Sequence, residues 1–460
     1  MERIRHLGEA RVGGLIVKYS IPAIAGMVVY GLNRIVGNAF VGKCLGSDAL
    51  AGFTVANSIV MIQLSFIMLV GSGSSALISM LLGKKDGSAA TRALGTALVV
   101  GLFVAAALAI PFEAFIRPML TAFGGRGEAL EYGVVFARVY LAGSAFAFWN
   151  TTLNSAIRAE GMPGKALLTN VVSFVANTAL TVLFVAVIPL GIAGVALANV
   201  ISQFAVTAWL GAHFIGKKTA LPISLASLVP DGKLARRLVA IGLAPFCMQF
   251  LGACMSLVTN NLIQAISGNF GLAVAGSVFS VYFLLIMPLQ GTSTGIQPII
   301  GYNFGAGLHD RVRKTVNASL AFTFAICVAE TALAYAFRHS LGGLFTSGDA
   351  GLASACARGL SLILLAFPVM CVQFVGSSYF LATGNARSAL AVNLFRSLSV
   401  LAPLFLLSAR FGMDGLFVAY PVTDFAVTIL CVFLLVSGMR VKGKAKVAEA
   451  KVAEAETARA

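Results

Sequence analysis

Apolar stretches of about 20 residues or more recur along the whole chain, and they constrain its fold more than any other feature. A helix of about 20 apolar residues is long enough to cross a hydrocarbon core of about 30 Å. Charged residues make up only 11% of the chain, whereas an ordinary soluble domain carries about 25%. The sequence therefore predicts an all-α polytopic membrane protein with twelve transmembrane helices. The predicted spans are 14–41, 49–80, 91–115, 133–157, 165–188, 190–213, 237–266, 271–300, 315–337, 355–382, 386–409 and 413–437.

The distribution of lysine and arginine predicts the orientation, because cytoplasmic loops of membrane proteins accumulate these residues. If the N-terminus is cytoplasmic, 24 basic residues fall on the cytoplasmic side and seven on the other. We therefore expect a multi-pass protein of the plasma (inner) membrane with both termini in the cytoplasm. The net charge of +16 then needs no nucleic-acid partner. The opening stretch MERIRHLGEARVGG has no small-residue cleavage site, which favours a retained signal anchor.

Two pairs of similar segments indicate an internal duplication. LGIAGVALANVISQFAVTAWL (190–210) aligns with FGMDGLFVAYPVTDFAVTILC (411–431), and RAEGMPGKALLTN (158–170) aligns with LATGNARSALAVN (381–393). Each copy holds six spans, an even number, so both copies enter the membrane in the same direction. The two six-helix lobes are then related by a pseudo-two-fold axis along the membrane normal, an arrangement found in transporters. The predicted divisions are an N-lobe at 1–213, a cytoplasmic linker at 214–236, a C-lobe at 237–439 and a basic cytoplasmic tail at 440–460, in which a repeated KVAEA favours a polar helix.

Four motifs together resemble those of a known transporter family. They are GSGSSALISMLLGKKD (71–86), RAEGMPGKA (158–166), GTSTGIQPIIGYNFGAG (291–307) and PVTDF (421–425). The chain resembles the multidrug and toxic compound extrusion (MATE) family, and more narrowly its bacterial drug-exporting branch. The resemblance implies a twelve-helix, two-lobed exporter that alternates between outward-open and inward-open states and is driven by protons or sodium.

The acids that the resemblance implies in the N-lobe are absent from this chain. The family pattern IVDxxFVG reads IVGNAFVG here, so Gly37, beside Asn38, occupies the acid position. The pattern NxxLDPxF reads NTALTVLF from Asn177, which places Thr181 at the second acid position. An antiporter needs a group in the membrane that changes charge or binds a cation, and intramembrane acids are the default candidates. The family's usual coupling chemistry therefore cannot simply be carried over.

Two acids remain well inside the predicted spans, Glu330 in the ninth and Asp424 in the twelfth. Asp424 lies at a depth comparable to that of Arg396 in the neighbouring span. One interpretation is a structural ion pair between them, and the other is a role in ion coupling. Glu330 has no obvious partner, so it is a candidate proton carrier or a residue that packs, or meets lipid, in its neutral form.

Arg34 introduces a positive charge where a spanning helix should avoid one. It lies one helical turn before Gly37, so it shares the face from which the family's acid would point into the N-lobe cavity. A charge at this depth costs on the order of 3 kcal/mol, which favours a functional site. Three interpretations stay open: a side chain that snorkels or bonds to carbonyls, a site for an anionic group, and a gating pair with an acid such as Glu330.

Amide and hydroxyl side chains at cavity depth are the other candidates for substrate contacts, although amides also bond helix to helix. Asn260 and Asn261 are adjacent and cannot both face the same helix, so at least one is expected to meet the cavity. The candidate cavity residues are Arg34, Asn38, Asn154, Asn177, Thr181, Asn260, Asn261 and Gln290; the candidates for ion coupling are Glu330, Asp424 and Arg396.

Catalytic and metal-binding patterns are weak in this chain. GTSTG (291–295) fits a serine-nucleophile pattern, but it lies in an apolar span with no histidine at comparable depth. It also fits GxxxG, as does GYNFG (301–305), and close helix packing is the better interpretation. The cysteines and histidines do not cluster, so no disulfide framework, metal site or cofactor is predicted. We expect a transporter and not an enzyme.

The resemblance implies efflux of small amphipathic organic solutes, such as drugs and toxic compounds, by an ion-coupled antiporter. The missing acids and Arg34 leave a second alternative, export of an anionic or zwitterionic metabolite. A flippase for lipid-linked precursors is a third, although such proteins usually carry additional spans, and a scaffold or receptor that transports nothing is a fourth. The expected partners are a small organic solute and the lipid bilayer, with the chain acting as a monomer.

Overall fold

The computed structural model describes residues 2–216, 219–343 and 350–457, and within these ranges the chain is helical, with no β-strand. The α-helices are α1 (Glu2–Glu9), α2 (Val12–Leu45), α3 (Ser47–Gly83), α4 (Gly87–Ala114), α5 (Ile116–Ala122), α6 (Gly127–Ala142), α7 (Ser144–Ala159), α8 (Pro163–Val182), α9 (Gly191–Ile215), α10 (Gly232–Gly305), α11 (His309–Ala336), α12 (Arg338–Gly343), α13 (Ala350–Ile363), α14 (Met370–Ala382), α15 (Ala386–Ser399) and α16 (Leu401–Thr457). Three short helices are irregular: the π-helix η1 (Leu183–Val187) and the 3₁₀ helices η2 (Leu225–Leu228) and η3 (Leu364–Val369).

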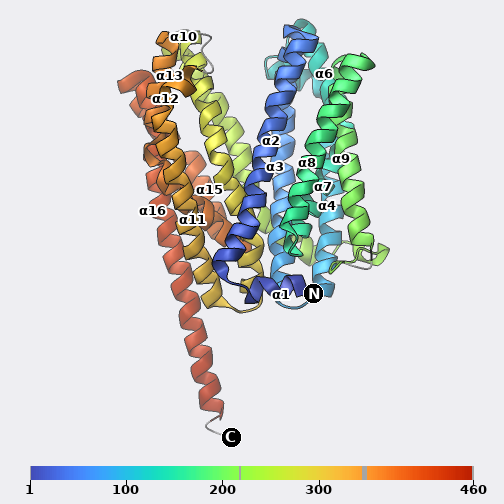
Figure 1. Ribbon diagram of the computed structural model, residues 1–460, viewed down its shortest axis with the longest axis vertical. Coiled ribbons are helices and arrows are strands. Elements are labelled where there is room, and N and C mark those ends of the chain that lie inside the picture. The colour runs from blue at the N-terminus through green and yellow to red at the C-terminus, as the bar shows by residue number, and fades with distance from the viewer. Residues whose placement is uncertain (1, 217–218, 344–349, 458–460) are drawn as a thin grey trace.

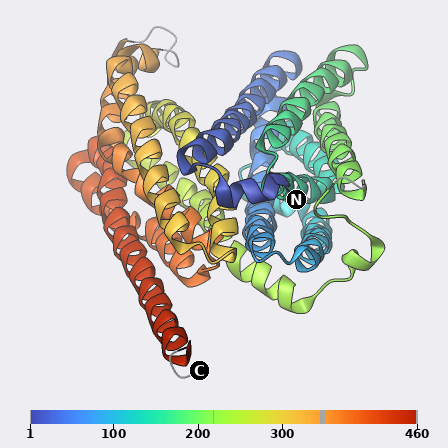
Figure 2. The same ribbon diagram turned by 60° about the horizontal axis from the view of Figure 1, so that its bottom comes forward.

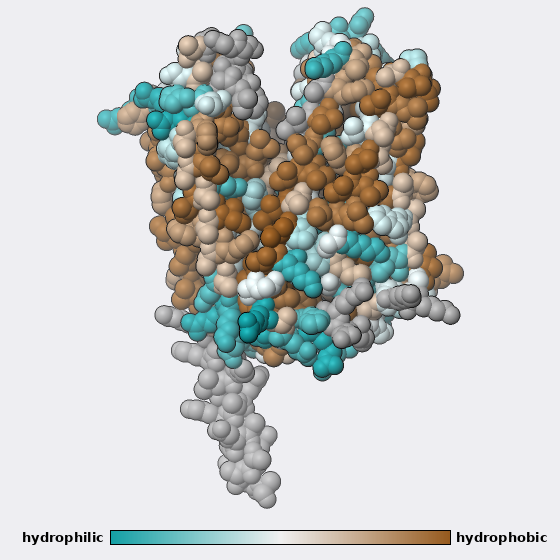
Figure 3. All heavy atoms as spheres, viewed as in Figure 1, coloured by the Kyte–Doolittle hydropathy of each residue, from teal (hydrophilic) through white to brown (hydrophobic). Residues whose placement is uncertain are grey.

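The helices gather into two lobes that diverge from a shared base (Figure 1). Helices α2–α9 form the N-lobe and α10–α16 form the C-lobe. We call the end that carries α1 the basal face and the opposite end the apical face. On the side that it displays, the space-filling view shows an apolar band across the middle of the molecule and a notch that separates the lobes at the apical face (Figure 3). This shape suits a protein whose flanks meet lipid while its centre opens to water on one side.

The predicted twelve spans are present. Nine helical segments of the described chain are long and apolar enough to cross a membrane, and a bent pair adds a tenth. Two of the nine each contain two spans, because α10 leaves the helical conformation at Gly268 and α16 does so at Gly412. The fold is therefore that of an all-α, multi-pass membrane protein.

Several spans are less regular than the sequence predicts. The predicted span 133–157 consists of α6 and α7, which are bent by 52° relative to each other at Gly143. The predicted span 355–382 is interrupted by η3, which contains Pro368. Because proline lacks a backbone N–H and clashes with the preceding turn, a regular helix cannot pass through this position unchanged.

The duplication is visible in the backbone as matched glycines with positive φ. The matched pairs, with φ in the same order, are Gly46 and Gly268 (88°, 56°), Gly161 and Gly384 (89°, 69°), and Gly191 and Gly412 (61°, 57°). Glycine adopts this left-handed region without the steric cost that other residues meet. The two lobes therefore build the same turns with glycines at equivalent positions.

The lobes pack against each other near the basal face, where glycines let helix backbones approach closely. A Cβ atom added to Gly291 of α10 would lie 2.5 Å from the Cα atom of Ile24 in α2. One added to Gly295 would lie 2.8 Å from the carbonyl oxygen of Tyr19. The second motif, 301–305, approaches α3 in the same way. The packing role predicted for both GxxxG motifs is confirmed.

The short amphipathic helix α1 lies across the basal face (Figure 2). Its Ile4 and Leu7 side chains are buried. Asn303 Nδ2 of α10 donates to the carbonyl oxygen of Leu7 at 2.9 Å, and Arg311 Nη2 of α11 donates to that of Ala10 at 2.7 Å. These two hydrogen bonds hold α1 and the residue that follows it against the C-lobe.

The linker between the lobes binds to the N-lobe at the carboxylate of Glu160. This residue is buried, with 4% of its surface exposed. Its Oε1 accepts hydrogen bonds from the backbone N–H groups of Ala220 (2.8 Å) and Leu221 (3.1 Å), and from the Thr219 hydroxyl. Its Oε2 lies 2.9 Å from Nε2 of His213. A charged group is tolerated in this buried place because every oxygen has partners.

Candidate functional site

A polar pocket lies in the N-lobe where α2 meets α8. It is lined by Asn33, Val36, Gly37, Phe40, Asn177, Thr178 and Thr181. Asn177 and Thr181, both predicted cavity residues, therefore come together beside Gly37, where the resemblance implies an acid. The cavity measures about 10 Å³, close to the smallest space that holds a water molecule. Its lining residues offer amides and hydroxyls and no carboxylate.

Thr178 completes this pocket, and the sequence reasoning missed it. Its Oγ1 atom is buried and has no hydrogen-bond partner in the described part of the chain. A buried polar group without a partner costs about 1–3 kcal/mol, so a water molecule or a polar ligand group would bind there favourably. Thr178 lies three residues before Thr181, on the same helix face, and this spacing could have identified it.

Two predicted residues of α2, Arg34 and Asn38, are not among the described side chains that line the pocket. The side chain of Arg34 lies outside the part that the structure describes, so its three interpretations stay predictions. Asn38 is exposed and does not line the pocket. Successive residues of a helix point about 100° apart, which turns Asn38 away from the face of Gly37.

Asn154, another predicted cavity residue, is 5% exposed and connects helices in this conformation. Its Nδ2 donates to the carbonyl oxygen of Ala166 at 3.1 Å and to the Thr169 hydroxyl at 2.8 Å, both on α8. Its Oδ1 accepts from Nη1 of Arg158. In this conformation the Asn154 amide therefore links helices by hydrogen bonds, which is the second role that the sequence leaves open for such amides.

The C-lobe contains a buried ion pair between α15 and α16. Arg396 Nε lies 3.3 Å from Asp424 Oδ1, and the Asp424 residue is only 3% exposed. Gln373 Nε2 of α14 donates to the same carboxylate oxygen at 3.3 Å and to the Asp424 carbonyl oxygen at 2.8 Å. The contact predicted between Arg396 and Asp424 is confirmed. Together with Gln373, the pair joins three helices.

The N-lobe contains a neutral counterpart of this cluster. The alignment that places one FAVT on the other matches Gln203 with Asp424, and the continuation of the second aligned pair matches Asn150 with Gln373. Asn150 Nδ2 donates to Gln203 Oε1 at 2.6 Å. The C-lobe therefore holds a carboxylate, paired with Arg396, at the place where the N-lobe holds an amide.

The remaining predicted residues of α10 are more exposed. Asn260 and Asn261 both have exposed side chains, and Gln290 is partly buried. Their neighbour Thr259 is buried, and its hydroxyl lies 3.3 Å from the Tyr420 hydroxyl. This contact between α10 and α16 was not predicted, although the offset that matches Gly46 with Gly268 also matches Gly37 of the N-lobe pocket with Thr259.

Glu330 lies in α11 with a partly exposed side chain. Its Oε2 atom is buried and has no hydrogen-bond partner in the described residues. A charged carboxylate in this position would lose hydration without gaining a partner. Its role as a proton carrier stays a prediction. Within the described chain, no three His, Cys, Asp or Glu side chains come together as a group that could hold a metal ion.

Comparison with known proteins identifies multidrug export proteins as relatives of this chain. The multidrug export protein MepA of Staphylococcus saprophyticus is 24% identical over 424 residues, which cover 90% of this chain and 91% of that protein. The MepA protein of Staphylococcus haemolyticus is 25% identical over 443 residues, which cover 94% and 95%. Both matches extend over nearly the whole of each chain.

Solved structures share the fold at low sequence identity. An outward-facing multidrug resistance MATE family transporter of the MOP superfamily superposes with a TM-score of 0.91 at 21% identity, covering 96% of this chain and 99% of that one. A MOP superfamily transporter from Pyrococcus furiosus, described as having a binding pocket of reverse polarity that suggests a different function, gives a TM-score of 0.90 at 21% identity, covering 95% and 98%.

The family match falls once in each lobe. The MatE family model matches residues 22–183 and 244–406, which together make up more than half of the chain. The two matched segments reproduce the duplication that the sequence and the paired glycine turns show independently. The chain therefore belongs to the MatE family, that of multidrug and toxic compound extrusion.

Proposed function

We propose that this protein is an efflux transporter that exports small amphipathic organic solutes across the plasma (inner) membrane by alternating access. The observation that carries the proposal is the asymmetry between its two ends. The lobes are separated by a notch at the apical face, whereas glycine contacts close them at the basal face (Figure 3). The multidrug export proteins among its relatives support the solute class. With both termini in the cytoplasm, this conformation is outward-open.

Alternating access requires the two faces to open in turn, which distances between spin labels can test. One label pair replaces Ser47 and Asn269, which are exposed at matched apical turns, and a second replaces Lys84 and Arg387 at the basal face. All native cysteines are replaced beforehand. Under transport conditions, the apical distance should shorten as the basal distance lengthens. Distances that stay constant in a sample with measured solute flux would contradict alternating access.

We also propose that transport is coupled to protons or sodium through the C-lobe, with no cofactor. The N-lobe pocket offers no carboxylate, whereas Asp424 and Glu330 remain in the spans of the C-lobe. A proton or cation that bound Asp424 would compete with Arg396 for the carboxylate, and so could alter the contact between α15 and α16.

The coupling proposal is tested with Asp424→Asn and Glu330→Gln in vesicles under an imposed pH or sodium gradient. The variant that removes the coupling group should lose gradient-driven transport and keep downhill exchange of solute. Asp414→Asn is the matched control, because Asp414 pairs with Arg358 in an exposed position. Gradient-driven transport that survives in both C-lobe variants would overturn this part of the proposal.

A second substrate class, an anionic or zwitterionic metabolite, is favoured by one specific observation. The N-lobe pocket is neutral where the resemblance implies acids, and Arg34 precedes Gly37 by one helical turn. The pocket itself has room for about one water molecule in this conformation, so a solute would bind beside it. There a cation would find no countercharge, whereas an anion could accept hydrogen bonds from Asn33, Asn177 and Thr178. Arg34→Ala should then abolish transport of an anion.

A further inference from the structure

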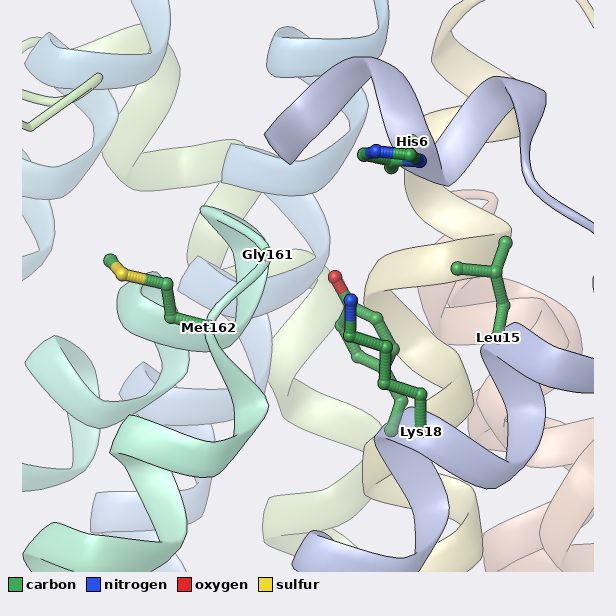
Figure 4. Close-up of a pocket in the computed structure, with 6 residues that line it drawn as sticks. His6, Leu15, Lys18, Gly161 and Met162 are labelled. Atoms are coloured by element: carbon green, nitrogen blue, oxygen red, sulfur yellow. The ribbon is translucent and has the colours of Figure 1, made fainter. Parts of the chain in front are cut away.

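A second pocket lies at the basal face, away from the N-lobe pocket described above. It is bordered by α1, the beginning of α2 and the turn between α7 and α8, it is open to solvent on one side, and its volume is about 170 Å³. The lining residues are His6, Leu15, Lys18, Tyr19, Gly161 and Met162. Figure 4 shows His6 projecting from α1 and Lys18 rising from α2 toward the same space, with Gly161 and Met162 on another side.

The polar groups of this pocket are hydrogen-bond donors. Lys18 contributes an ammonium group, His6 a ring N–H and Tyr19 a phenolic hydroxyl. The lining contains no carboxylate, and neither Lys18 nor His6 forms an ion pair among the residues that the structure describes. The basic residue that precedes His6 is engaged elsewhere, because Arg5 pairs with Glu9.

The acid nearest in sequence to the pocket forms no ion pair with Lys18 or His6 within the described chain. Glu160 precedes Gly161, but its carboxylate is turned to the linker, where Ala220, Leu221 and His213 contact its oxygens. The Lys18 ammonium group therefore has no direct carboxylate partner among the described residues. Leu15 and the buried Tyr19 ring give the pocket apolar walls, whereas His6 and Lys18 are exposed, so an anion can reach both from solvent.

We propose that this pocket binds a phosphate group, with Lys18 as its countercharge and His6 and Tyr19 as further donors. Two sources share this chemistry. One is the headgroup of an anionic lipid, because a basal face in the cytoplasm would border a leaflet rich in such lipids. The other is free phosphate or a phosphorylated solute from the aqueous side. The binding itself does not depend on the proposed transport activity.

Occupancy of the pocket has a structural consequence. A phosphate held between Lys18 of α2 and His6 of α1 would fix α1 in place, and α1 is also bound to the C-lobe through Asn303 and Arg311. The bound anion would therefore stabilise the conformation in which the basal face is closed.

The test measures binding by the full-length protein to two probes. Inorganic phosphate is titrated against protein in neutral detergent, and the thermal unfolding midpoint is recorded. In parallel, protein in nanodiscs of phosphatidylcholine is compared with protein in nanodiscs that contain phosphatidic acid. The variants are Lys18→Gln and His6→Gln. The control is Lys84→Gln, which removes an exposed charge from the same face but outside the pocket.

Lys18→Gln should weaken the binding of the effective probe about tenfold or more, because it removes a charge-assisted hydrogen bond. His6→Gln should weaken it less, and Lys84→Gln should leave it unchanged. A response to inorganic phosphate supports a soluble ligand, and a response to phosphatidic acid alone supports a lipid headgroup. The proposal is overturned if wild type responds to neither probe, or if Lys84→Gln loses as much binding as Lys18→Gln.

Discussion

Arg396 and Asp424 form a buried ion pair, with Nε and Oδ1 3.3 Å apart, at the place where the N-lobe holds hydrogen-bonded amides. The two copies of the duplication have therefore diverged in charge at one matched position. Burial of a charge pair is costly, and its Coulomb attraction offsets that cost only while both partners are present. The C-lobe therefore has an ionisable carboxylate at a position where the N-lobe has an amide.

Removal of one partner from this pair should destabilise the protein strongly. Asp424→Ala leaves the Arg396 guanidinium partly buried without its partner, so we expect a loss of about 3–5 kcal/mol in the free energy of unfolding. The double variant Arg396→Met, Asp424→Ala should recover most of that loss. Thermal and denaturant unfolding in detergent measures both. Asp414→Ala, which breaks the exposed pair with Arg358, serves as control and should cost about 0–1 kcal/mol. If Asp424→Ala and Asp414→Ala lowered the free energy of unfolding equally, this account would be contradicted.

Close packing at the basal interface should be sensitive to a single methyl group. In Gly295→Ala, the new Cβ would lie 2.8 Å from the Tyr19 carbonyl oxygen, so the backbones of α10 and α2 must separate. We expect destabilisation of about 1–3 kcal/mol and a longer basal distance in the spin-label experiment. Gly276→Ala on the same helix element meets no atom within 4 Å and should have little effect. An unchanged basal distance in Gly295→Ala would show that this contact does not hold the lobes together.

The Glu160 carboxylate should control the order of the linker. Glu160→Ala removes the acceptor for the N–H groups of Ala220 and Leu221, so their hydrogen exchange should become faster by at least about tenfold. Glu160→Gln keeps the Oε1 acceptor and should retain most of the protection. Hydrogen exchange measured by mass spectrometry on linker peptides distinguishes the variants. Exchange that is equally fast in both would mean that charge, and not the acceptor, holds the linker.

Arg311 should hold α1 on the basal face. Its Nη2 donates to the Ala10 carbonyl oxygen and its Nε donates to Asn303 Oδ1 at 3.1 Å. Arg311→Ala should therefore increase hydrogen exchange and proteolysis in α1 and shift the lobes toward basal opening. Arg313→Ala is the matched control, since Arg313 is exposed on the same helix. If the control loosens α1 to the same extent, general surface charge, and not the specific contact, accounts for the effect.

The sequence predicted the spans well because each needs only length and apolarity, which a single chain reveals directly. The breaks at Gly268 and Gly412 lie within a few residues of the predicted span ends. The bend at Gly143 and the change of helix type at η3 were not predicted, because they lie inside apolar stretches that look continuous. Irregularities of this kind depend on packing against neighbouring helices more than on local composition.

The candidate site was predicted in part. The pairing of Arg396 with Asp424 followed from comparable depth in adjacent spans, since two buried charges of opposite sign tend to meet. Asn154 and Asn177 could not be told apart from sequence, although one joins helices and the other lines a pocket. The pocket formed by His6 and Lys18 was missed, because α1 folds back onto helices distant in the chain.

The most direct test of the central claim, solute export by a MATE-type carrier, is transport in proteoliposomes. One organic cation, one organic anion and a fluorescent lipid-linked headgroup are assayed under an imposed pH gradient with wild type, Arg34→Ala and Glu330→Gln. The account predicts flux of an organic solute above that of empty vesicles. Cation flux lost in Glu330→Gln would indicate a carboxylate relocated to the C-lobe, and anion flux lost in Arg34→Ala would indicate an N-lobe built for the opposite charge. Lipid translocation without flux of either solute, or no flux at all in vesicles with correctly folded protein, would contradict it.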